Sequence, residues 1–310
     1  MDIKRASVTV FGAANTDMVG FPDDRLVFND SNKGVIKLLP GGVGRNIAEN
    51  LARLGQRVSL VSAFGEDFFR RFLYDHAKEL GIRMDESIIV PGASSAVFSA
   101  VLNRNNDLAV AIADMQIYDK LSPTAFQKDF PSVEAADYVV LETNFPASVL
   151  DYLVNRFPEK RWVLDTVSGD KAKRAQSIFG QLFVLKTNLL EAEVLTGISA
   201  RESRYEDMVK YFLDEGVRNV FITLGKEGVI YGNREQIHYL PPVPAKVLNT
   251  IGAGDAFLSG VIFGFIQDFP LDKIAQSGLI SAGLTVQSER VVSDEIAPEV
   301  ILEKLKDHAH

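Results

Sequence analysis

Short apolar segments alternate with longer, helix-like segments over most of this chain, starting near residue 57. We predict strands at residues 57–65, 138–142, 162–166, 183–187 and 219–224. We predict helices at residues 68–80, directly after Pro146, from about residue 170, between the strand at 183–187 and residue 195, and at residues 205–213. Gly81 closes the first of these helices and Gly197 closes the fourth. Because a helix between strands lets them run parallel, this alternation predicts βαβ units and a mostly parallel sheet.

The N-terminal part has a similar plan. Residues 7–14 are predicted to form a buried strand with a small-residue ending, and Asn15 and Asp17 follow it. Apolar residues at helical spacing over 43–54 predict a helix with Asn46 in its first turn. Ligands gather at the carboxyl ends of strands in open α/β sheets, so these polar residues are candidates for ligand binding. They could equally close local turns.

Two segments do not fit the alternation. Residues 25–29 and 34–39 read as two short strands around a turn-rich cluster, and residues 96–102 and 108–113 form a similar pattern. We expect both hairpins to belong to a small separate sheet. No internal repeat or linker is present, which predicts one domain with a β appendage.

Residues 249–260 contain a sharp turn followed directly by an apolar, helix-compatible run. Gly252 and Gly254 let successive backbone N–H groups converge, and the positive end of the following helix attracts an anion. Asp255 falls in the first turn of that helix. It could merely cap the helix, or it could take a proton from a hydroxyl that attacks a phosphate.

Further polar residues end other predicted strands. They are Asn144, the group Lys186, Asn188 and Glu191, and the group Thr223, Gly225 and Gly228. Any one of them could be a cap or a turn residue. All of them fall at the same predicted sheet edge as Asn15 and Gly252, and this convergence favours a binding site there.

Composition narrows the class of protein. The formal net charge of −8 argues against a nucleic-acid partner, and no apolar run approaches the length of a membrane span. The absence of cysteine excludes disulfides and thiolate metal sites and fits a reducing compartment. No segment resembles a secretory signal, so we expect a cytoplasmic protein.

With these residues identified, the chain resembles the ribokinase-like (PfkB-type) sugar kinase family over nearly its whole length. The matching stretches, in the family's order, are Asn15-Thr16-Asp17, Gly41-Gly42-Val43-Gly44-Arg45-Asn46, Asn188-Leu189-Leu190-Glu191, Thr223-Leu224-Gly225-Lys226-Glu227-Gly228 and Asn249-Thr250-Ile251-Gly252-Ala253-Gly254-Asp255. The resemblance implies a three-layer α/β/α fold, a single domain over residues 1–310, and a β lid formed by about 18–40 and 90–117. We also expect a homodimer through the lid.

The resemblance further implies roles for individual residues. Asp255 is the expected base, and backbone N–H groups of Gly252, Ala253 and Gly254 form the expected anion hole. The expected substrate-binding residues are Asn15, Asp17, Ser31, Asn32, Gly41, Gly42, Asn46, Asp114, Asn144 and Asp255. The expected ATP-binding residues are Lys186, Asn188, Thr223, Gly225, Gly228, Thr250, Gly252 and Gly254. Glu191 is expected to hold Mg²⁺ through water.

Within the family, the chain most resembles the branch of pseudouridine kinases. This resemblance rests on residues 30–34 and 41–50, on Asp114-Met115, and on Asn249 in place of the family's usual Asp. Asn249 lacks the negative charge of that Asp, which helps to hold a monovalent cation in the family, so binding of such a cation by this chain is in doubt.

Other substrates and one other class of protein stay open. A kinase for ribose, adenosine or a keto-deoxy sugar acid is an alternative, and Lys37 and Arg45 are candidate partners for an acid. A protein that senses nucleotides or sugars without catalysis is less favoured, because Asp255 is intact. A dinucleotide-binding dehydrogenase is excluded, since the first strand is not followed by Gly-x-Gly-x-x-Gly.

Overall fold

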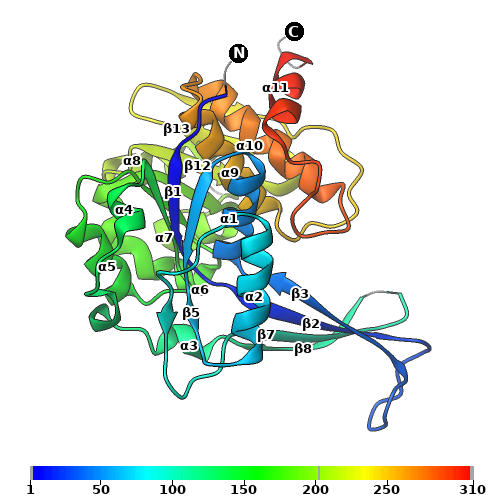
Figure 1. Ribbon diagram of the computed structural model, residues 1–310. Helices are drawn as coiled ribbons and strands as arrows, with labels where there is room; N and C mark the ends of the chain where they lie inside the picture. The colour runs from blue at the N-terminus through cyan, green and yellow to red at the C-terminus, as the bar shows by residue number, and fades with distance from the viewer. Residues whose placement is uncertain (1–2, 106, 202, 308–310) are drawn as a thin grey trace.

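The computed structural model describes residues 3–105, 107–201 and 203–307 (Figure 1). Within these ranges the largest sheet has eight strands. In spatial order they are β14 (Ile237–Leu240), β13 (Val229–Gly232), β12 (Asn219–Thr223), β11 (Leu182–Asn188), β10 (Trp162–Asp165), β9 (Tyr138–Glu142), β1 (Ser7–Phe11) and β4 (Arg57–Val61). Strands β12 to β4 pair in parallel, while β13 and β14 are antiparallel. The predicted mostly parallel sheet is therefore confirmed.

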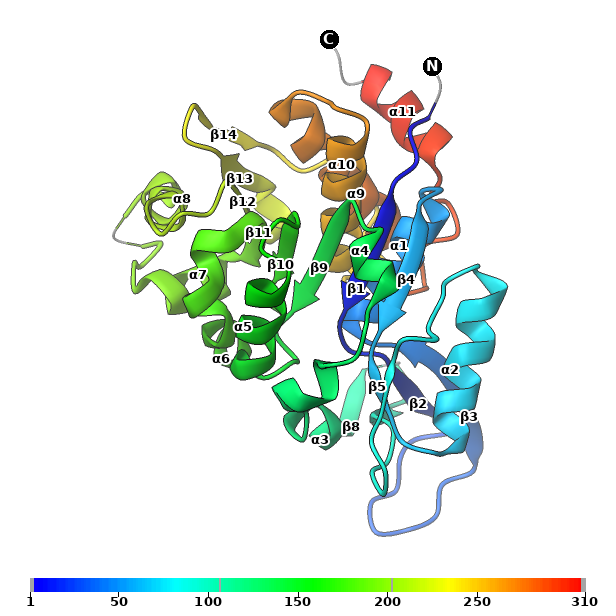
Figure 2. The same ribbon diagram turned by 60° about the vertical axis from the view of Figure 1, so that its left-hand side comes forward.

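Helices cover both faces of this sheet (Figure 2). On one face lie α1 (Val43–Arg53), α2 (Phe68–Glu79), α9 (Ala253–Ile266) and α10 (Leu271–Val286), with α11 (Pro298–Asp307) packed outside α9 and α10. On the other face lie α3 (Gln116–Asp119), α4 (Pro131–Glu134), α5 (Ala147–Arg156), α6 (Gly169–Ala172), α7 (Leu189–Thr196) and α8 (Tyr205–Asp214). Short 3₁₀ segments occupy Pro123–Phe126, Lys173–Gln181 and Gly225–Glu227.

Strand β9 shows how the sequence produces these layers. All five of its residues are buried, because its two faces both meet helices. Tyr138 and Val140 join the core beneath α1 and α9, whereas Val139 and Leu141 join the core beneath α5 and α8. A strand covered on both sides has to be a continuous apolar run, which is the pattern that the sequence carries. Its polar groups are confined to its ends.

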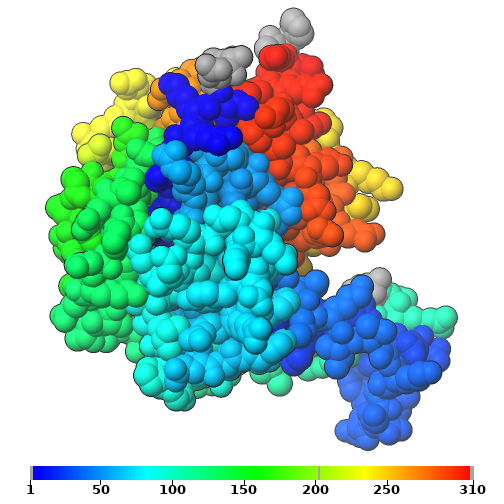
Figure 3. Space-filling model, viewed as in Figure 1, coloured from blue at the N-terminus to red at the C-terminus, as the bar shows by residue number. Residues whose placement is uncertain are grey.

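The hairpins form a second sheet, which we call the small sheet. Its order is β3 (Gly34–Gly41), β2 (Asn15–Pro22), β7 (Val97–Leu102) and β8 (Leu108–Asp114). It projects from the body of the protein as an arm (Figures 1 and 3). The prediction of a small separate sheet is thus correct, and the hairpin at residues 96–113 lies where it was expected.

One predicted strand is wrong. Residues 25–29 are not a strand but part of the loop that joins β2 to β3, and the first strand of that hairpin is instead Asn15–Pro22. The chain passes from β1 almost directly into β2, so the polar residues after β1 are also the first residues of the small sheet. Apolar Val27 and Phe28 resemble strand residues in the sequence, but they are exposed in the loop.

Smaller differences also occur. The predicted strand at 57–65 divides into β4 and β5 (Ala63–Phe64), and β5 pairs with β6 (Ile88–Ile89) in a separate two-stranded sheet. The sequence pattern predicted no strand or helix for four later elements. These are the antiparallel strands β13 and β14 and the helices α10 and α11. They complete the edge of the main sheet and the layer over α9.

Candidate active site

The N-terminus of α9 lies at the carboxyl ends of the parallel strands. Gly252 precedes the helix with a φ of 80°, and a Cβ atom there would lie 2.2 Å from the carbonyl oxygen of Val291, so only glycine fits. The N–H of Ala253 donates to Thr250 within the turn. Among the described residues the N–H groups of Gly254 and Asp255 have no acceptor. Two free donors at the positive end of a long helix suit an anion.

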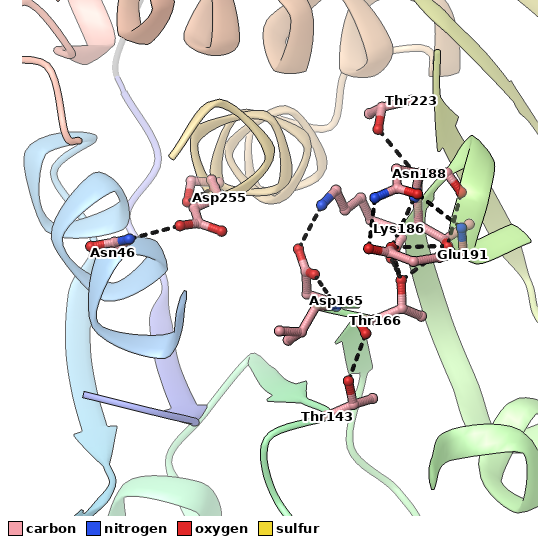
Figure 4. Close-up of polar contacts among 12 residues, drawn as sticks. Asn46, Thr143, Asp165, Thr166, Lys186, Asn188, Glu191, Thr223 and Asp255 are labelled. Carbon is pink, nitrogen blue, oxygen red and sulfur yellow. Dashed lines mark hydrogen bonds and ion pairs between the residues drawn. The ribbon is translucent and has the colours of Figure 1, made fainter. Parts of the chain in front are cut away.

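Asp255 is buried in the first turn of α9. Its Oδ2 accepts a hydrogen bond of 2.8 Å from Nδ2 of Asn46 on α1 (Figure 4). Burial is the main cause that raises the pKa of Asp255 to about 7, and the nearby Asp165 raises it further. Lys186 and the hydrogen bond from Asn46 act in the opposite direction. A carboxylate that titrates near neutral pH is suited to accepting a proton.

A buried ion pair lies beside this helix end. Lys186 at the end of β11 donates from Nζ to Oδ2 of Asp165 on β10 over 2.9 Å, and both side chains are almost fully buried (Figure 4). Burial alone would lower the pKa of Lys186, but Asp165, Asp255 and Glu191 leave it raised. The Nζ atom lies 2.8 Å from the place of a Cβ on Gly254. The ammonium group therefore adds to the positive end of α9.

Asn15 and Asp17 form the other half of the site. Nδ2 of Asn15 donates to Oδ1 of Asp17 over 2.6 Å, and the Asp17 carboxylate lies against the backbone of Gly41. Burial raises the pKa of Asp17, while the hydrogen bond from Asn15 and the charge of Arg45 lower it. An amide beside a carboxylate offers donors and acceptors to neighbouring hydroxyl groups of a sugar.

Close backbone packing joins these two halves. The place of a Cβ on Gly44 lies 2.6 Å from Cα of Gly12, so the start of α1 rests directly on the end of β1. The N–H of Arg45 donates to the carbonyl of Ala13 over 3.0 Å. This contact fixes the start of α1, from which Asn46 reaches Asp255. A larger residue at position 44 would separate the helix from the strand.

The segment after β11 is organised first as a helix cap. The Asn188 side chain accepts from the N–H of Glu191, and the Glu191 carboxylate accepts from the N–H and the side chain of Asn188. Thr166 also donates to Glu191 over 2.5 Å. Both carboxylate oxygens are thus engaged by protein donors (Figure 4). A metal near Glu191 would therefore have to be held through water, and this role of Glu191 stays a prediction.

The remaining predicted nucleotide residues surround the same edge. Thr223 ends β12, donates to the carbonyl of Thr187 and leads into the turn at Gly225–Glu227. Gly228 follows with a φ of 100°. The side chain of Asn249 accepts from the N–H of Ile251 over 2.9 Å, so its oxygen closes a turn. A cation at this place would depend on backbone carbonyls.

Sequence reasoning missed two buried acids. Glu142, the last residue of β9, accepts hydrogen bonds from the N–H groups of Ala13 and Asn144, and burial raises its pKa to about 7. Asp165 ends β10 in the same way. The available signal was a single acid that closes an otherwise apolar strand. Asp165 and Glu142 both raise the pKa of Asp255, so they belong to the electrostatics of the site.

Some predicted substrate residues do not reach this centre. Ser31 and Asn32 lie in the β2–β3 loop, at the far tip of a hairpin whose strands run from Asn15 to Pro22, roughly 20 Å long. Asn32 bonds there to the backbone of Val27. The structure places them away from Asn15 and Asp17 of the same chain, because the hairpin extends outward.

Two other predicted residues are placed differently from expectation. Asp114 is exposed and lies in register with Val97 and Thr16, on the face of the small sheet opposite to that of Asp17. Asn144 is buried, but its amide donates to Glu142 and its oxygen accepts from Lys171. Its side chain therefore supports Glu142 at this edge of the sheet.

Lys37 and Arg45, the candidate partners for a sugar acid, are both engaged elsewhere in the structure. The Arg45 guanidinium is buried and bonds to Glu49 and Asn46. Lys37 lies on the small sheet, with Nζ 5.0 Å from the centre of the Phe21 ring. Neither side chain is directed to the centre as a free cation. This placement weakens the sugar-acid alternative.

No group of three or more His, Asp or Glu side chains among the described residues is arranged to hold a metal ion. Within the same ranges no helix is long and apolar enough to cross a membrane. The cytoplasmic location stays a prediction.

The mostly parallel main sheet, covered by helices on both faces, has the ribokinase-like fold. The fold matches the solved structure of ribokinase from Thermotoga maritima with a TM-score of 0.84, at 22% identity and over 97% of this chain and 99% of that chain. The chain belongs to the pfkB family of carbohydrate kinases, whose sequence profile matches residues 5–297.

Two relatives illustrate the range of substrates in the family. Pseudouridine kinase of Escherichia coli K12 is 32% identical over 267 residues, which cover 85% of each chain. The 5-dehydro-2-deoxygluconokinase of Clostridium perfringens is 27% identical over 288 residues, covering 86% of this chain and 83% of that enzyme. The resemblance to the family in the sequence is thus confirmed.

Replacing Asp255 with asparagine should stabilise the protein above neutral pH. The raised pKa means that the folded state prefers the protonated acid, so this group weakens folding as pH rises from about 4 to about 7. An asparagine at this position would not titrate. We expect the free energy of unfolding to increase on the order of a few kcal/mol at pH 8 and by less at pH 5, measured by urea denaturation. Asp75→Asn, at an exposed side chain, is the control. An equal effect of Asp255→Asn at both pH values would contradict this electrostatic assignment.

Proposed function

We propose that this protein transfers the γ-phosphate of ATP to the 5′-hydroxyl of pseudouridine. The observation that carries the proposal is the position of Asp255, buried between Asn46 and Lys186 at the open end of α9. On one side it meets groups suited to a sugar, and on the other a helix end and an ammonium suited to phosphate. The similarity to the pseudouridine kinase of Escherichia coli supports this choice of substrate.

In the proposed reaction, Asn15 and Asp17 hold the ribose and direct its 5′-hydroxyl toward Asp255. Asp255 accepts the hydroxyl proton while the oxygen forms a bond to the γ-phosphorus. The bond from that phosphorus to the bridging oxygen breaks, and ADP leaves with the electron pair. The N–H groups expected to stabilise the charge on the transferring group were those of Gly252, Ala253 and Gly254, but the N–H of Ala253 already donates to Thr250. The free N–H groups of Gly254 and Asp255, together with Lys186, would stabilise this charge.

ATP and Mg²⁺ fit this site on chemical grounds. Lys186, Asn188, Thr223, Gly225, Gly228 and Thr250 would accommodate the nucleotide. Mg²⁺ characteristically keeps several waters and binds phosphate oxygens, so a single engaged carboxylate at Glu191 suffices on the protein side. When bound, the metal offsets phosphate charge.

The nucleobase of pseudouridine would lie against the face of the small sheet that carries Asp17. We propose that this sheet acts as a lid. Leu39, Asp17, Phe98 and Ala113 pair in one row across its four strands, so they share the face that carries Asp17. Phe98 offers an aromatic surface for a nucleobase. Free ribose could not use this surface, and it would also promote less closure of the lid.

The opposite face of the small sheet suggests a homodimer. Ile36, Val110 and Ile112 lie on it, and each is more than half exposed. An exposed apolar sheet face with unpaired edges favours a second copy of the chain. In such a dimer the loop tip that carries Ser31 and Asn32 would be available to the partner's lid, which would give these residues their predicted contact with the base.

A kinase for ribose, adenosine or a sugar acid is the second candidate. The relative from Clostridium perfringens supports the sugar acid, but Arg45 is engaged by Glu49. A sensor without catalysis is disfavoured because Asp255 and the free N–H groups beside it are both in place.

Asp255→Asn should abolish turnover and keep nucleotide binding. The asparagine preserves the shape of the side chain but cannot accept the proton, and loss of a positioned base costs roughly 10²–10⁴-fold in rate. ADP release measures turnover, and calorimetry with a non-hydrolysable ATP analogue measures binding. Turnover within tenfold of the natural protein would overturn the assignment of the base.

Pseudouridine should be phosphorylated with a higher kcat/KM than uridine, adenosine, ribose or 5-dehydro-2-deoxygluconate. It carries an N–H where uridine has its glycosidic bond, so uridine would leave a buried acceptor unpaired, at about 1–3 kcal/mol. This energy corresponds to roughly 5- to 150-fold. All compounds are compared by ADP release under one condition. Equal or greater activity on another compound would refute the substrate, while the kinase class would stand.

A homodimer should have the mass of two chains by light scattering. A lid that closes over the substrate should show slower hydrogen exchange in β2, β3, β7 and β8 when substrate binds. Val110→Asp should produce a monomer, because it places a charge on the apolar face. Leu190→Asp, at an exposed apolar residue on α7, is the matched control and should leave the mass unchanged. A monomeric natural protein would contradict the dimer, and unchanged exchange with both substrates present would contradict a closing lid.

A further inference from the structure

A chain of charged side chains runs along α1 from the surface to Asp255. Asp294 bonds to Arg53 over 2.9 Å, and Arg53 bonds to Glu49 over 2.9 Å. Glu49 forms an ion pair with Arg45, and both of these side chains are almost fully buried. Nη1 of Arg45 then donates to Oδ1 of Asn46 over 2.9 Å. Since Asn46 donates to Asp255, the chain ends at the proposed base.

Helix stability does not account for Arg45. It lies in the first turn of α1, where the helix dipole disfavours a positive charge, and no acidic residue shares that turn. Burial lowers its pKa, and its Nε is one of three buried side-chain atoms in the described ranges without a hydrogen-bond partner. A buried ion pair is seldom more stable than well-packed apolar residues. The guanidinium also donates to the carbonyl of Pro40 on β3 over 3.2 Å, a contact that does not need a buried charge. The charge of the arginine therefore has an unfavourable place in the fold and calls for another role.

The chemistry of the guanidinium group defines that role. It only donates hydrogen bonds, so the side chain of Asn46 has to turn its oxygen toward Arg45. The NH₂ group of the same amide then faces Oδ2 of Asp255. If the amide turned by 180°, its oxygen would face the carboxylate and repel it. With Arg45 present, Oδ2 of Asp255 is occupied and Oδ1 remains for the substrate hydroxyl.

We infer that Arg45 is a positioning residue, which orients the Asn46 amide and thereby keeps Asp255 ionised with Oδ1 free to accept a proton. Glu49 balances the charge of Arg45, and Arg53 and Asp294 hold Glu49 in place. This inference rests on the proposed role of Asp255 in phosphoryl transfer.

The charges around Asp255 determine the direction in which each substitution should move its pKa. Asp165 on β10 and Glu142 on β9 raise the pKa of Asp255, while Lys186 on β11 and Asn46 on α1 lower it. The positive charge of Arg45 interacts with Asp255, with Asp17 on β2 and with Arg53 on its own helix. His76 on α2 also interacts with Arg45 and Glu49. Removing Arg45 should therefore raise the pKa of Asp255, and removing the charge of Glu49 should lower it.

The first experiment measures pH profiles of kcat and kcat/KM for pseudouridine and ATP. In Arg45→Met, kcat should fall roughly 10- to 100-fold because the base is misoriented, and KM should change little. The acid limb of the profile should move up by roughly one pH unit, whereas in Glu49→Gln it should move down. Arg45→Lys keeps the charge without the planar fork and should lose kcat with a smaller pH shift. Arg71→Met, an exposed arginine on α2 with its own acidic partner, is the matched control.

A second variant separates orientation from folding. Arg45→Met with Glu49→Leu removes the ion pair as a unit, which is compatible with a folded protein, as unfolding by urea would verify. Its kcat should stay low, because the amide of Asn46 is no longer oriented. Recovery of the natural kcat in this double variant would overturn the inference, as would shifts of equal sign in Arg45→Met and Glu49→Gln.

Titration of the Asp255 carboxyl carbon by NMR, without substrate, provides a readout that does not depend on kinase activity. The pKa should rise in Arg45→Met and fall in Glu49→Gln. If these shifts occur but no compound is phosphorylated, the proposed function fails and the positioning of Asp255 stands. If phosphorylation occurs and Asp255 titrates identically in all variants, the inference fails and the proposed function stands.

Discussion

Burial of the main sheet on both faces is the constraint on which the rest of this structure depends. Apolar side chains of β1, β9, β10 and β11 meet helices on both sides, so a polar group within these strands needs a partner in the protein, as Thr9 has in the carbonyl of Ser132. Most polar residues of these strands therefore lie near their carboxyl ends. Because the strands from β12 to β4 are parallel, their carboxyl ends form one edge, and the start of α9 lies at that edge. The site is thus a consequence of the way the core is covered.

The buried charges at this edge lower the stability of the folded protein. Asp255, Glu142 and Asp165 are buried carboxylates, and burial raises the pKa of the first two to about 7. Lys186 and Arg45 offset part of this negative charge from two neighbouring elements, β11 and α1. Such an arrangement is less stable than an apolar one would be, and it is retained where a group has to titrate near neutral pH. The positive end of α9 could attract an anion without a general positive surface, in keeping with a net charge of −8.

The small sheet follows different rules from the main sheet. It is attached through β2, which starts immediately after β1, so Asn15 and Asp17 belong to both the binding edge and the arm. One of its faces carries Asp17, the other carries Ile36, Val110 and Ile112, and both faces expose apolar side chains. Neither face is covered by a helix layer like that of the main sheet, which is why the arm stands away from the body in Figure 3.

The sequence by itself determined the layered α/β fold, the small sheet, and the elements that carry most candidate residues. Apolar periodicity and glycine punctuation are local signals, and they placed Gly252 and Asp255 at the start of a helix and Asn46 in the first turn of another. The direction and partners of side chains are not local properties. Only the tertiary structure decided that Glu142 and Asp165 face the site, that Ser31 and Asn32 lie at a distant tip, and that Asp114 points to the opposite face. The contact of Arg45 and Asn46 with Asp255 also became visible only in the tertiary structure. Helices α1 and α9 are more than 200 residues apart in the chain, and they meet because both pack against the same sheet.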